Sequence, residues 1–233
     1  MRVDELAKTL DHTLLDPRAT QADVARACAE ARRHHVAAVC SFPAFLPALR
    51  EHLGGGDVRA CAAVALPHGA ELPPTKVAAV EQAVAAGADE VDVTMNVPAM
   101  RSGDFRLVRD ELVGVVRAAR ARAANGGRGD VIVKVVIEAP YLDDKLTRLA
   151  CKIVADAGAD FAKTGSGVAT RATVRDVELM REALPASVGV TAAGGIRTLE
   201  EAELMLNAGA ARVASSTAVE IVRELARLDG ALA

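Results

Sequence analysis

The chain has 233 residues, of which 51% are hydrophobic and 25% are charged, and its formal net charge is −3. This composition is ordinary for a globular enzyme, and the length suits one barrel, so we expect a single domain over residues 1–233. There is no basic block, no Trp and one Tyr (Tyr141), and no apolar run reaches membrane-spanning length. Neither nucleic acid nor a membrane is therefore an expected partner.

The histidines and cysteines show no metal-ligand spacing, so we expect neither a metal site nor disulfides. The N-terminus also lacks the apolar run of a signal peptide, which favours a reduced, cytoplasmic protein. The residues concerned are His12, His34, His35, His52, His68, Cys28, Cys40, Cys61 and Cys151.

Strand-like and helix-like segments alternate along the chain. We expect a first strand, or the loop after it, at 10–13, and further strands at 36–42, 58–66, 88–96, 130–138, 159–164, 187–192 and 211–215. Helices are expected at 4–10, 20–33, 73–86, 104–124, 142–157, 171–183, 198–207 and 216–228, and another ending at Leu53. Eight strand–helix units predict a (β/α)8 barrel. A doubly wound sheet is the alternative, but it normally has fewer strands and a glycine-rich first turn.

Residues 159–167 form an apolar strand whose last inward residue is Lys163, followed by a loop of small residues. Burial disfavours the ammonium form, so we expect the pKa of Lys163 to be lowered. A lysine that is neutral near pH 7 attacks carbonyl groups and forms a Schiff base. The glycines behind it offer backbone N–H groups to an anion.

Strand parity places further charged residues inside the barrel. In 130–138 the all-apolar side should face the helices, which turns Lys134 and Glu138 inward, and the same argument turns Asp92 inward. An Asp–Lys pair alone would be explained by structure. Two lysines and an acid on three consecutive strands favour a reactive amine, because a nearby ammonium group lowers the pKa of a lysine.

The loops after strands 7 and 8 are the usual phosphate site of this architecture. They contain Gly194 and Gly195, which allow close backbone approach, and Ser215 and Ser216, which add hydroxyl groups. A tight turn and a helix cap are the structural alternative for either loop alone. Both loops together favour phosphate binding.

Several motifs, in order along nearly the whole chain, resemble the 2-deoxyribose-5-phosphate aldolases, a family of Schiff-base barrel enzymes. The resemblance implies that Lys163 forms the Schiff base, that Asp92 relays protons and that Cys40 lies near the substrate. It also implies that Gly167, Gly194, Gly195, Ser215 and Ser216 hold the phosphate and that no cofactor is needed. The matching segments are 10–15, 39–40, 66–69, 87–92, 133–138, 158–164 and 194–198.

One departure from the family pattern concerns catalysis. The family carries a second lysine at the end of strand 7, where this chain has Thr191. The working hypothesis is a cytoplasmic aldolase that interconverts 2-deoxy-D-ribose 5-phosphate with glyceraldehyde 3-phosphate and acetaldehyde, with Lys134 assisting Asp92 in proton transfer. The alternatives are an aldolase for another phosphorylated sugar or aldehyde, and a sugar-phosphate-binding protein without catalysis. A homodimer is expected only because such assemblies are common.

Overall fold

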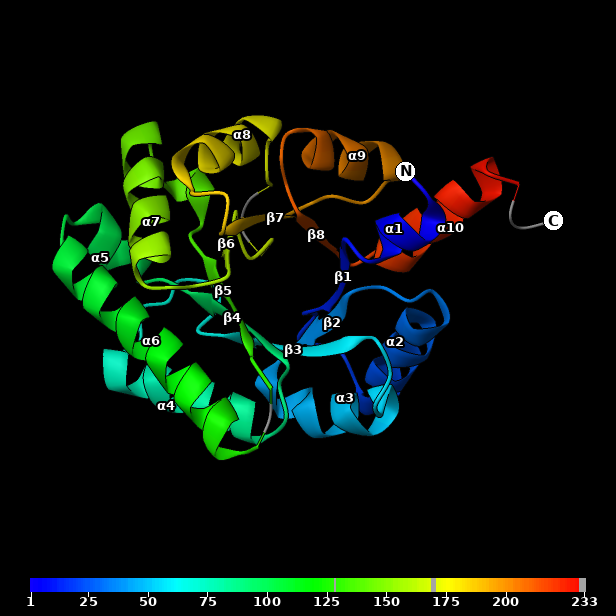
Figure 1. The fold of residues 1–233 in the computed structure, drawn as a ribbon, viewed down its shortest axis with the longest axis horizontal. Helices are drawn as coiled ribbons and strands as arrows, with labels where there is room; N and C mark the ends of the chain where they lie inside the picture. Colours follow the sequence, from blue (N-terminus) through cyan, green and yellow to red (C-terminus); the bar gives the residue numbers. More distant parts are fainter. Residues whose placement is uncertain (128, 169–170, 231–233) are drawn as a thin grey trace.

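The computed structural model describes residues 1–127, 129–168 and 171–230. Its centre is a closed barrel of eight parallel strands that neighbour one another in chain order (Figure 1). The predicted (β/α)8 barrel is therefore confirmed. The strands are β1 (Leu10–Leu14), β2 (Ala38–Ser41), β3 (Arg59–Val64), β4 (Glu90–Thr94), β5 (Ile132–Val136), β6 (Phe161–Lys163), β7 (Gly189–Ala193) and β8 (Arg212–Ser215).

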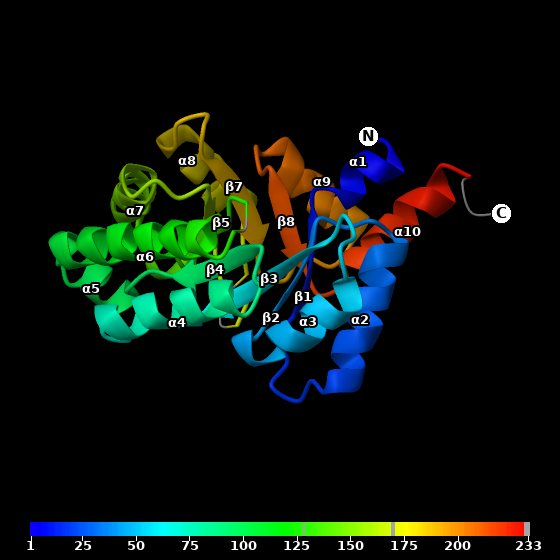
Figure 2. The same ribbon diagram turned by 60° about the horizontal axis from the view of Figure 1, so that its bottom comes forward.

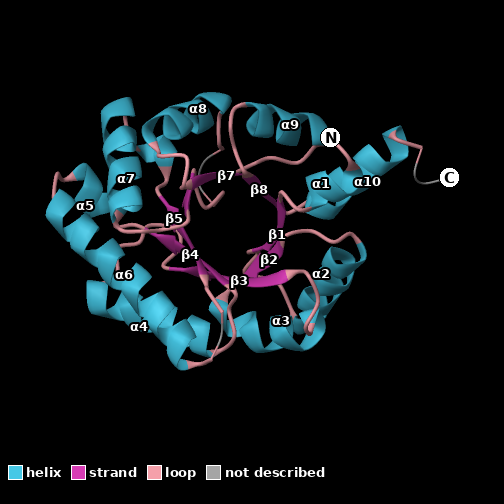
Figure 3. Ribbon diagram, in the orientation of Figure 1, coloured by secondary structure: helices cyan, strands magenta, loops and turns pink. Residues whose placement is uncertain are grey.

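A ring of helices surrounds the strands, as Figure 3 shows, and the short N-terminal helix α1 lies against the last helix, α10. None of the helices in the described part of the chain is long and apolar enough to cross a membrane. The α-helices are α1 (Val3–Ala7), α2 (Gln21–Arg33), α3 (Leu46–Leu53), α4 (Pro73–Ala85), α5 (Val97–Arg101), α6 (Phe105–Asn125), α7 (Asp144–Asp156), α8 (Val174–Ala183), α9 (Leu199–Asn207) and α10 (Ala218–Leu228); the 3-10 helices are η1 (Pro43–Phe45) and η2 (Ala139–Tyr141).

Local sequence explains most helix starts. Three helices begin with a capping box. In each, the side chain of the capping threonine accepts a hydrogen bond from the backbone N–H three residues on, and the acidic side chain at that position accepts one from the backbone N–H of the threonine. The capping residues are Thr20, Thr173 and Thr198. One helix was not predicted: α5 follows β4 directly, capped by the Asn96 side chain, which accepts a hydrogen bond from the Ala99 N–H.

The core lies between the strands and the helices. Val133 and Val135 of β5 are fully buried on the helix-facing side, as the apolar pattern predicted. Inside the barrel, the ring of Phe161 fills the space beside Gly189, its register partner on β7. A Cβ atom added at Gly189 would lie 2.4 Å from this ring, so only glycine fits there.

The strand register sets one row of residues across five strands. Thr94 is paired with Val136, Val136 with Lys163, Lys163 with Thr191, and Thr191 with Arg212. Register partners in a sheet point to the same face, and Lys163 points into the barrel. We call these five residues the lysine row. Figure 2, turned by 60° from Figure 1, shows these strands with helices around them.

Candidate active site

Lys163 ends β6 with its side chain inside the barrel and only 2% of its surface exposed. Its Nζ donates a hydrogen bond to Asp92 Oδ2 across the barrel, over 2.6 Å. Asp92 is itself 1% exposed and sits in the middle of β4. The two residues that the sequence placed on the inner face are thus in direct contact, and they form a buried ion pair.

Lys134 joins the same carboxylate from the neighbouring strand. Its Nζ lies 3.3 Å from Asp92 Oδ1, 2.8 Å from Asp11 Oδ2 and 2.6 Å from Glu90 Oε2. Burial alone lowers the pKa of Lys134, but the three carboxylates raise it well above the usual value. The Lys134 ammonium group therefore keeps its charge although it is buried. Lys134 is therefore a fixed positive charge beneath Lys163.

Arg212 completes this arrangement from β8, and sequence reasoning did not select it. Its guanidinium is ion-paired with Asp11, and its Nη2 lies 3.4 Å from Glu90 Oε2. The six residues Asp11, Glu90, Asp92, Lys134, Lys163 and Arg212 form what we call the inner ion network. Three carboxylates in it face three cations, and the half-exposed Arg59 adds a weaker contact to Glu90 at 3.6 Å.

The expectation of a lowered pKa for Lys163 was wrong. Burial does lower this pKa, and so does Lys134, but contact with the Asp92 carboxylate outweighs both and raises it above the ordinary lysine value. For the Asp92 carboxyl group, burial raises the pKa, but the ammonium groups of Lys134 and Lys163 hold it well below its usual range. The resting site is therefore an ammonium–carboxylate pair, and the amine must lose a proton before it can act as a nucleophile.

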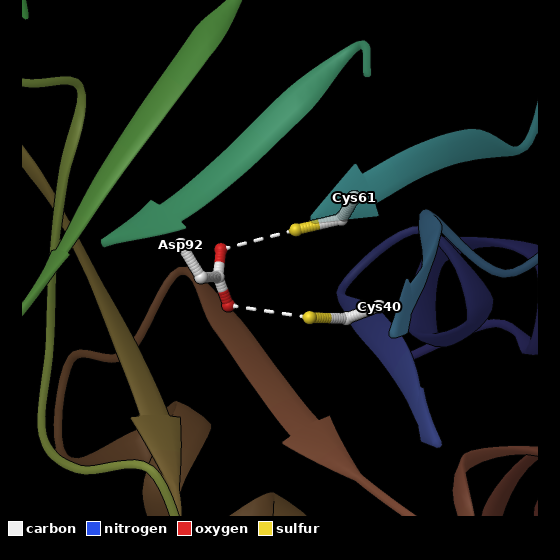
Figure 4. A group of neighbouring side chains, drawn as sticks. All are labelled: Cys40, Cys61 and Asp92. Carbon is white, nitrogen blue, oxygen red and sulfur yellow. Dashed lines mark hydrogen bonds between the residues drawn. The ribbon is translucent and has the colours of Figure 1, made fainter. Parts of the chain in front are cut away.

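Two thiols complete the surroundings of Asp92 (Figure 4). Cys61 Sγ donates to Asp92 Oδ1 over 3.2 Å, and Cys40 Sγ donates to Oδ2 over 3.7 Å. Each oxygen of the Asp92 carboxylate thus contacts one ammonium group and one thiol. Cys40, which the family resemblance placed near the substrate, points at Asp92 and is fully buried.

The same three side chains also bring ligand atoms within 4.8 Å of one another, as a metal site would. Metal binding needs thiolates, and burial raises the pKa of Cys61 well above the usual thiol value. Both oxygens of Asp92 are also already paired with ammonium groups. This chemistry favours thiol donors that hold Asp92 in place over metal ligands.

A cavity of about 600 Å³ opens above Lys163 at the carboxyl end of the barrel. Its walls include the loops that the sequence assigned to phosphate. Gly167 and Gly195 adopt positive φ angles of 76° and 72°, and a Cβ atom on Gly167 would lie 3.3 Å from Gly194 Cα. The two glycine loops therefore approach each other closely at the cavity wall. The predicted loop residues that line the cavity are Gly167, Gly194, Gly195, Ser215 and Ser216.

The two serines are not equivalent. Ser215 is 3% exposed, and its hydroxyl donates to the Ile196 carbonyl and accepts from the Thr217 N–H. Ser216 is exposed at the mouth of the cavity. Ser215 therefore connects the two loops, while Ser216 leaves its hydroxyl available.

Glu138 lies just beyond β5 and serves the loop after Lys163. The strand ends at Val136, and Glu138 takes a positive φ of 50°. Its Oε1 accepts the Ser166 N–H over 2.7 Å, while burial raises the pKa of the carboxyl group. The expected extension of the strand to this residue was wrong, although the side chain is buried as parity suggested.

Thr191 occupies the position where the family pattern has its second lysine. It lies on β7 beside Lys163, is fully buried, and its hydroxyl has no hydrogen-bond partner within the described part of the chain. No positive charge replaces the family lysine at this position.

A buried lysine at the carboxyl end of a parallel barrel strand, beside a cavity at that end, is typical of (β/α)8-barrel enzymes, and this chain is an enzyme of that class. The family model described as "DeoC/LacD family aldolase" matches residues 6–219, and the chain belongs to this family.

Named relatives and a solved structure agree with this assignment. The deoxyribose-phosphate aldolase of Caldanaerobacter subterraneus is 42% identical over 220 residues, covering 94% of this chain and 93% of the relative. That of Brevibacillus brevis is 41% identical over 216 residues, covering 92% and 94%. The structure of the tetrameric deoxyribose phosphate aldolase from Aeropyrum pernix superposes with a TM-score of 0.86 at 31% identity, covering 97% of this chain and 93% of the other.

Proposed function

We propose that this aldolase cleaves 2-deoxy-D-ribose 5-phosphate reversibly to D-glyceraldehyde 3-phosphate and acetaldehyde through a Schiff base on Lys163. The observation that carries the proposal is the Lys163–Asp92 contact of 2.6 Å beneath the glycine-lined cavity. An amine and a proton acceptor are in contact at the carboxyl end of the barrel, where Lys163 lines the cavity. The names of the relatives supply the substrate.

The reaction begins with a proton transfer. Lys163 is charged at rest, so its proton moves through Asp92 to solvent or to the substrate oxygen as Nζ adds to the aldehyde carbon C1. The new C1–N bond gives a carbinolamine, and loss of water gives a protonated Schiff base. Lys134 remains paired with Asp92 throughout and stabilises its carboxylate form.

Carbon–carbon cleavage uses the Schiff base as an electron sink. A base removes the proton of the C3 hydroxyl, the C2–C3 bond breaks, and its electrons form an enamine on C1 and C2. Glyceraldehyde 3-phosphate is released, the enamine is protonated at C2, and water hydrolyses the imine to acetaldehyde and free Lys163. Asp92 with ordered water is the proposed proton carrier in both steps.

The phosphate is proposed to bind where the loops after β6, β7 and β8 meet. Gly167, Gly194 and Gly195 line the cavity there, and Ser216 is exposed. Phosphate suits this composition, because glycine loops next to a helix N-terminus provide donors and a positive dipole end. Anchoring the phosphate here holds C1 toward Lys163.

Borohydride trapping tests the Schiff base directly. The enzyme is incubated with deoxyribose 5-phosphate or acetaldehyde, reduced with borohydride, digested and mapped by mass spectrometry. We expect an adduct on Lys163 in the wild type and none in Lys163→Met. Lys152→Met, which alters an exposed lysine on α7, is the matched control and should retain the adduct. Sugar-phosphate binding without an adduct on any lysine would instead support a binding protein, and turnover of a different phosphorylated sugar would support the alternative aldolase.

We further propose that the enzyme acts in the cytoplasm as a homodimer. Its cysteines are free and buried, which suits a reducing compartment. Twofold dimers are the commonest closed assemblies, but the Aeropyrum pernix relative is tetrameric by its title. Sedimentation velocity decides between the two assemblies, and fractionation of the source cells tests the compartment.

A further inference from the structure

Two hydroxyl groups in the lysine row are buried without a hydrogen-bond partner. Thr94 and Thr191 are both fully inaccessible, and neither Oγ1 contacts a donor or an acceptor among the described residues. Leaving a buried hydroxyl unpaired destabilises a fold, because its hydrogen bonds to water are lost without replacement. Valine would fill the same volume without this cost, so the presence of threonine calls for an explanation.

The two positions differ in their relation to Lys163. Thr191 is its immediate register partner on the adjacent strand, whereas Thr94 is two strands away on the other side. Adjacent strands lie about 4.8 Å apart, so the Thr191 side chain borders the Lys163 side chain directly. Lys163 Nζ is paired with Asp92 of β4, which leaves Thr191 flanking it on the β7 side.

Thr191 is fully buried and directly precedes a segment of the cavity wall. Two and three residues further along the same chain, Ala193 and Gly194 line the cavity that Lys163 also lines. A ligand joined to Nζ and reaching toward the glycine loops would therefore start next to Thr191 and extend along the segment that follows it. Its unpaired hydroxyl is suited to an oxygen atom close to the attacked carbon.

We propose that the Thr191 hydroxyl donates a hydrogen bond to the oxygen on the carbon that Lys163 attacks. This inference rests on the proposed Schiff-base function. As Nζ adds to C1, the C=O double bond becomes a single bond, and negative charge develops on the oxygen. The Lys163 nitrogen gives up one proton before it adds to C1 and a second one afterwards, and both are carried to this oxygen, which then leaves as water. Thr191 keeps its own proton throughout. The ligand class is the carbonyl group of an aldehyde.

Conservative variants at position 191 separate the hydroxyl from the shape of the side chain. Thr191→Val removes the hydroxyl and keeps the volume, while Thr191→Ser keeps the hydroxyl. The rate of adduct formation on Lys163 is measured by quenching with borohydride at increasing times, using acetaldehyde, which has no phosphate. Because loss of one such donor slows related reactions by about 10²–10³-fold, we expect slowing of this order in Thr191→Val and a rate within a few-fold of the wild type in Thr191→Ser.

Stability provides the readout for a merely structural role. Thr191→Val should unfold at the same urea concentration as the wild type or a higher one, because the unpaired hydroxyl is gone, and Thr94→Val calibrates the effect of this exchange elsewhere in the barrel. If Thr191→Val does not fold, Thr191→Ala is compared with Thr191→Ser in the same assay. Adduct formation in Thr191→Val at the wild-type rate overturns the inference and leaves the proposed function intact. Absence of any adduct in the wild type overturns both.

Discussion

Lys163 Nζ and Asp92 Oδ2 lie 2.6 Å apart in a part of the barrel where both side chains are almost inaccessible. Their contact favours the charged forms of both groups, so the amine that we propose as the nucleophile is an ammonium ion at rest. The enzyme must then spend part of its activation free energy on removing this proton. Several measurable consequences follow from this one pair.

Replacing Asp92 by Asn should remove the proton acceptor and keep the size of the side chain. General acid–base groups contribute about 10²–10⁴-fold to rate, so we expect turnover of deoxyribose 5-phosphate to fall by that range. Asp156→Asn is the matched control, because Asp156 forms an exposed ion pair with Lys152 on α7 and is far from the chemistry. Turnover of Asp92→Asn within tenfold of the wild type would contradict the assigned role.

The rate of adduct formation should increase with pH across the neutral range. Because the Asp92 carboxylate raises the pKa of Lys163, the neutral amine is scarce at pH 7 and becomes about tenfold more abundant with each pH unit. Stopped-time borohydride trapping with acetaldehyde between pH 6 and about pH 9 measures this slope. A rate that levels off below pH 8 would show that the amine is already neutral there.

Stability against acid should depend on the inner ion network. The pKa of Asp11 is lowered despite burial, because Lys134 and Arg212 favour its carboxylate, and Asp92 is lowered in the same way. A carboxyl group with a lowered folded-state pKa stabilises the fold above its unfolded pKa of about 3.9, and this stabilisation is lost as the pH falls through the folded-state value. Urea unfolding should therefore become easier below about pH 4.

Asp11→Asn tests which residue carries the acid dependence. Removing a partner of a buried ion pair costs about 3–5 kcal/mol, so this variant should be much less stable at pH 7. Its remaining stability should also change less between pH 6 and about pH 3 than that of the wild type. An unaltered pH dependence would exclude Asp11 as a source of the acid sensitivity.

Thr191→Lys adds a cation beside Lys163 and should lower the pKa of the nucleophile by like-charge repulsion. We expect the pH–rate profile to move to lower pH, because more of the Lys163 amine is neutral at a given pH. The fourth cation should also reduce the free energy of unfolding by about 1–3 kcal/mol. Unchanged turnover and an unchanged profile would mean that the site already works without a second lysine.

Gly189→Ala should destabilise the interior of the barrel, where Gly189 of β7 lies beside Phe161 of β6. The added Cβ would lie 2.4 Å from the Phe161 ring, and overpacking of this kind costs about 1–3 kcal/mol. Gly129→Ala is the matched control, since nothing lies within 4 Å of the corresponding Cβ. Equal urea midpoints for the two variants would show that the Phe161 ring moves aside freely.

The sequence was sufficient to predict the barrel architecture and the inward direction of the lysines in the strands. Alternating strand and helix segments led to the barrel, and strand parity placed Asp92 and Lys134 on the inner face, where the structure has them paired. Parity works here because β4 and β5 are regular and their outer faces are uniformly apolar. Helix α5 escaped detection because Pro98 and the short segment around it resemble a loop.

The direction of the pKa shift of Lys163 could not be predicted from the sequence. Burial and the nearby Lys134 lower the pKa of Lys163, and the opposing effect of Asp92 depends on a distance that only the folded chain defines. Arg212, Glu90 and Asp11 were missed as members of the network for a related reason. Each lies near the start of its strand, where a charged residue is easily attributed to the preceding loop. The signal that could have revealed them is a charged residue within a β-rich run.

The inner ion network has a consequence for the order of events in a turnover. Asp11, Glu90 and Lys134 are wholly inaccessible, whereas Lys163 lines the cavity at the carboxyl end of the barrel. In the proposed reaction, both fragments of a cleaved sugar would leave through this cavity. The fragment still joined to Lys163 would lie deeper, with the phosphorylated fragment between it and solvent. Departure should therefore be sequential, the phosphorylated aldehyde first and the two-carbon aldehyde last, and in synthesis the two should arrive in the reverse order.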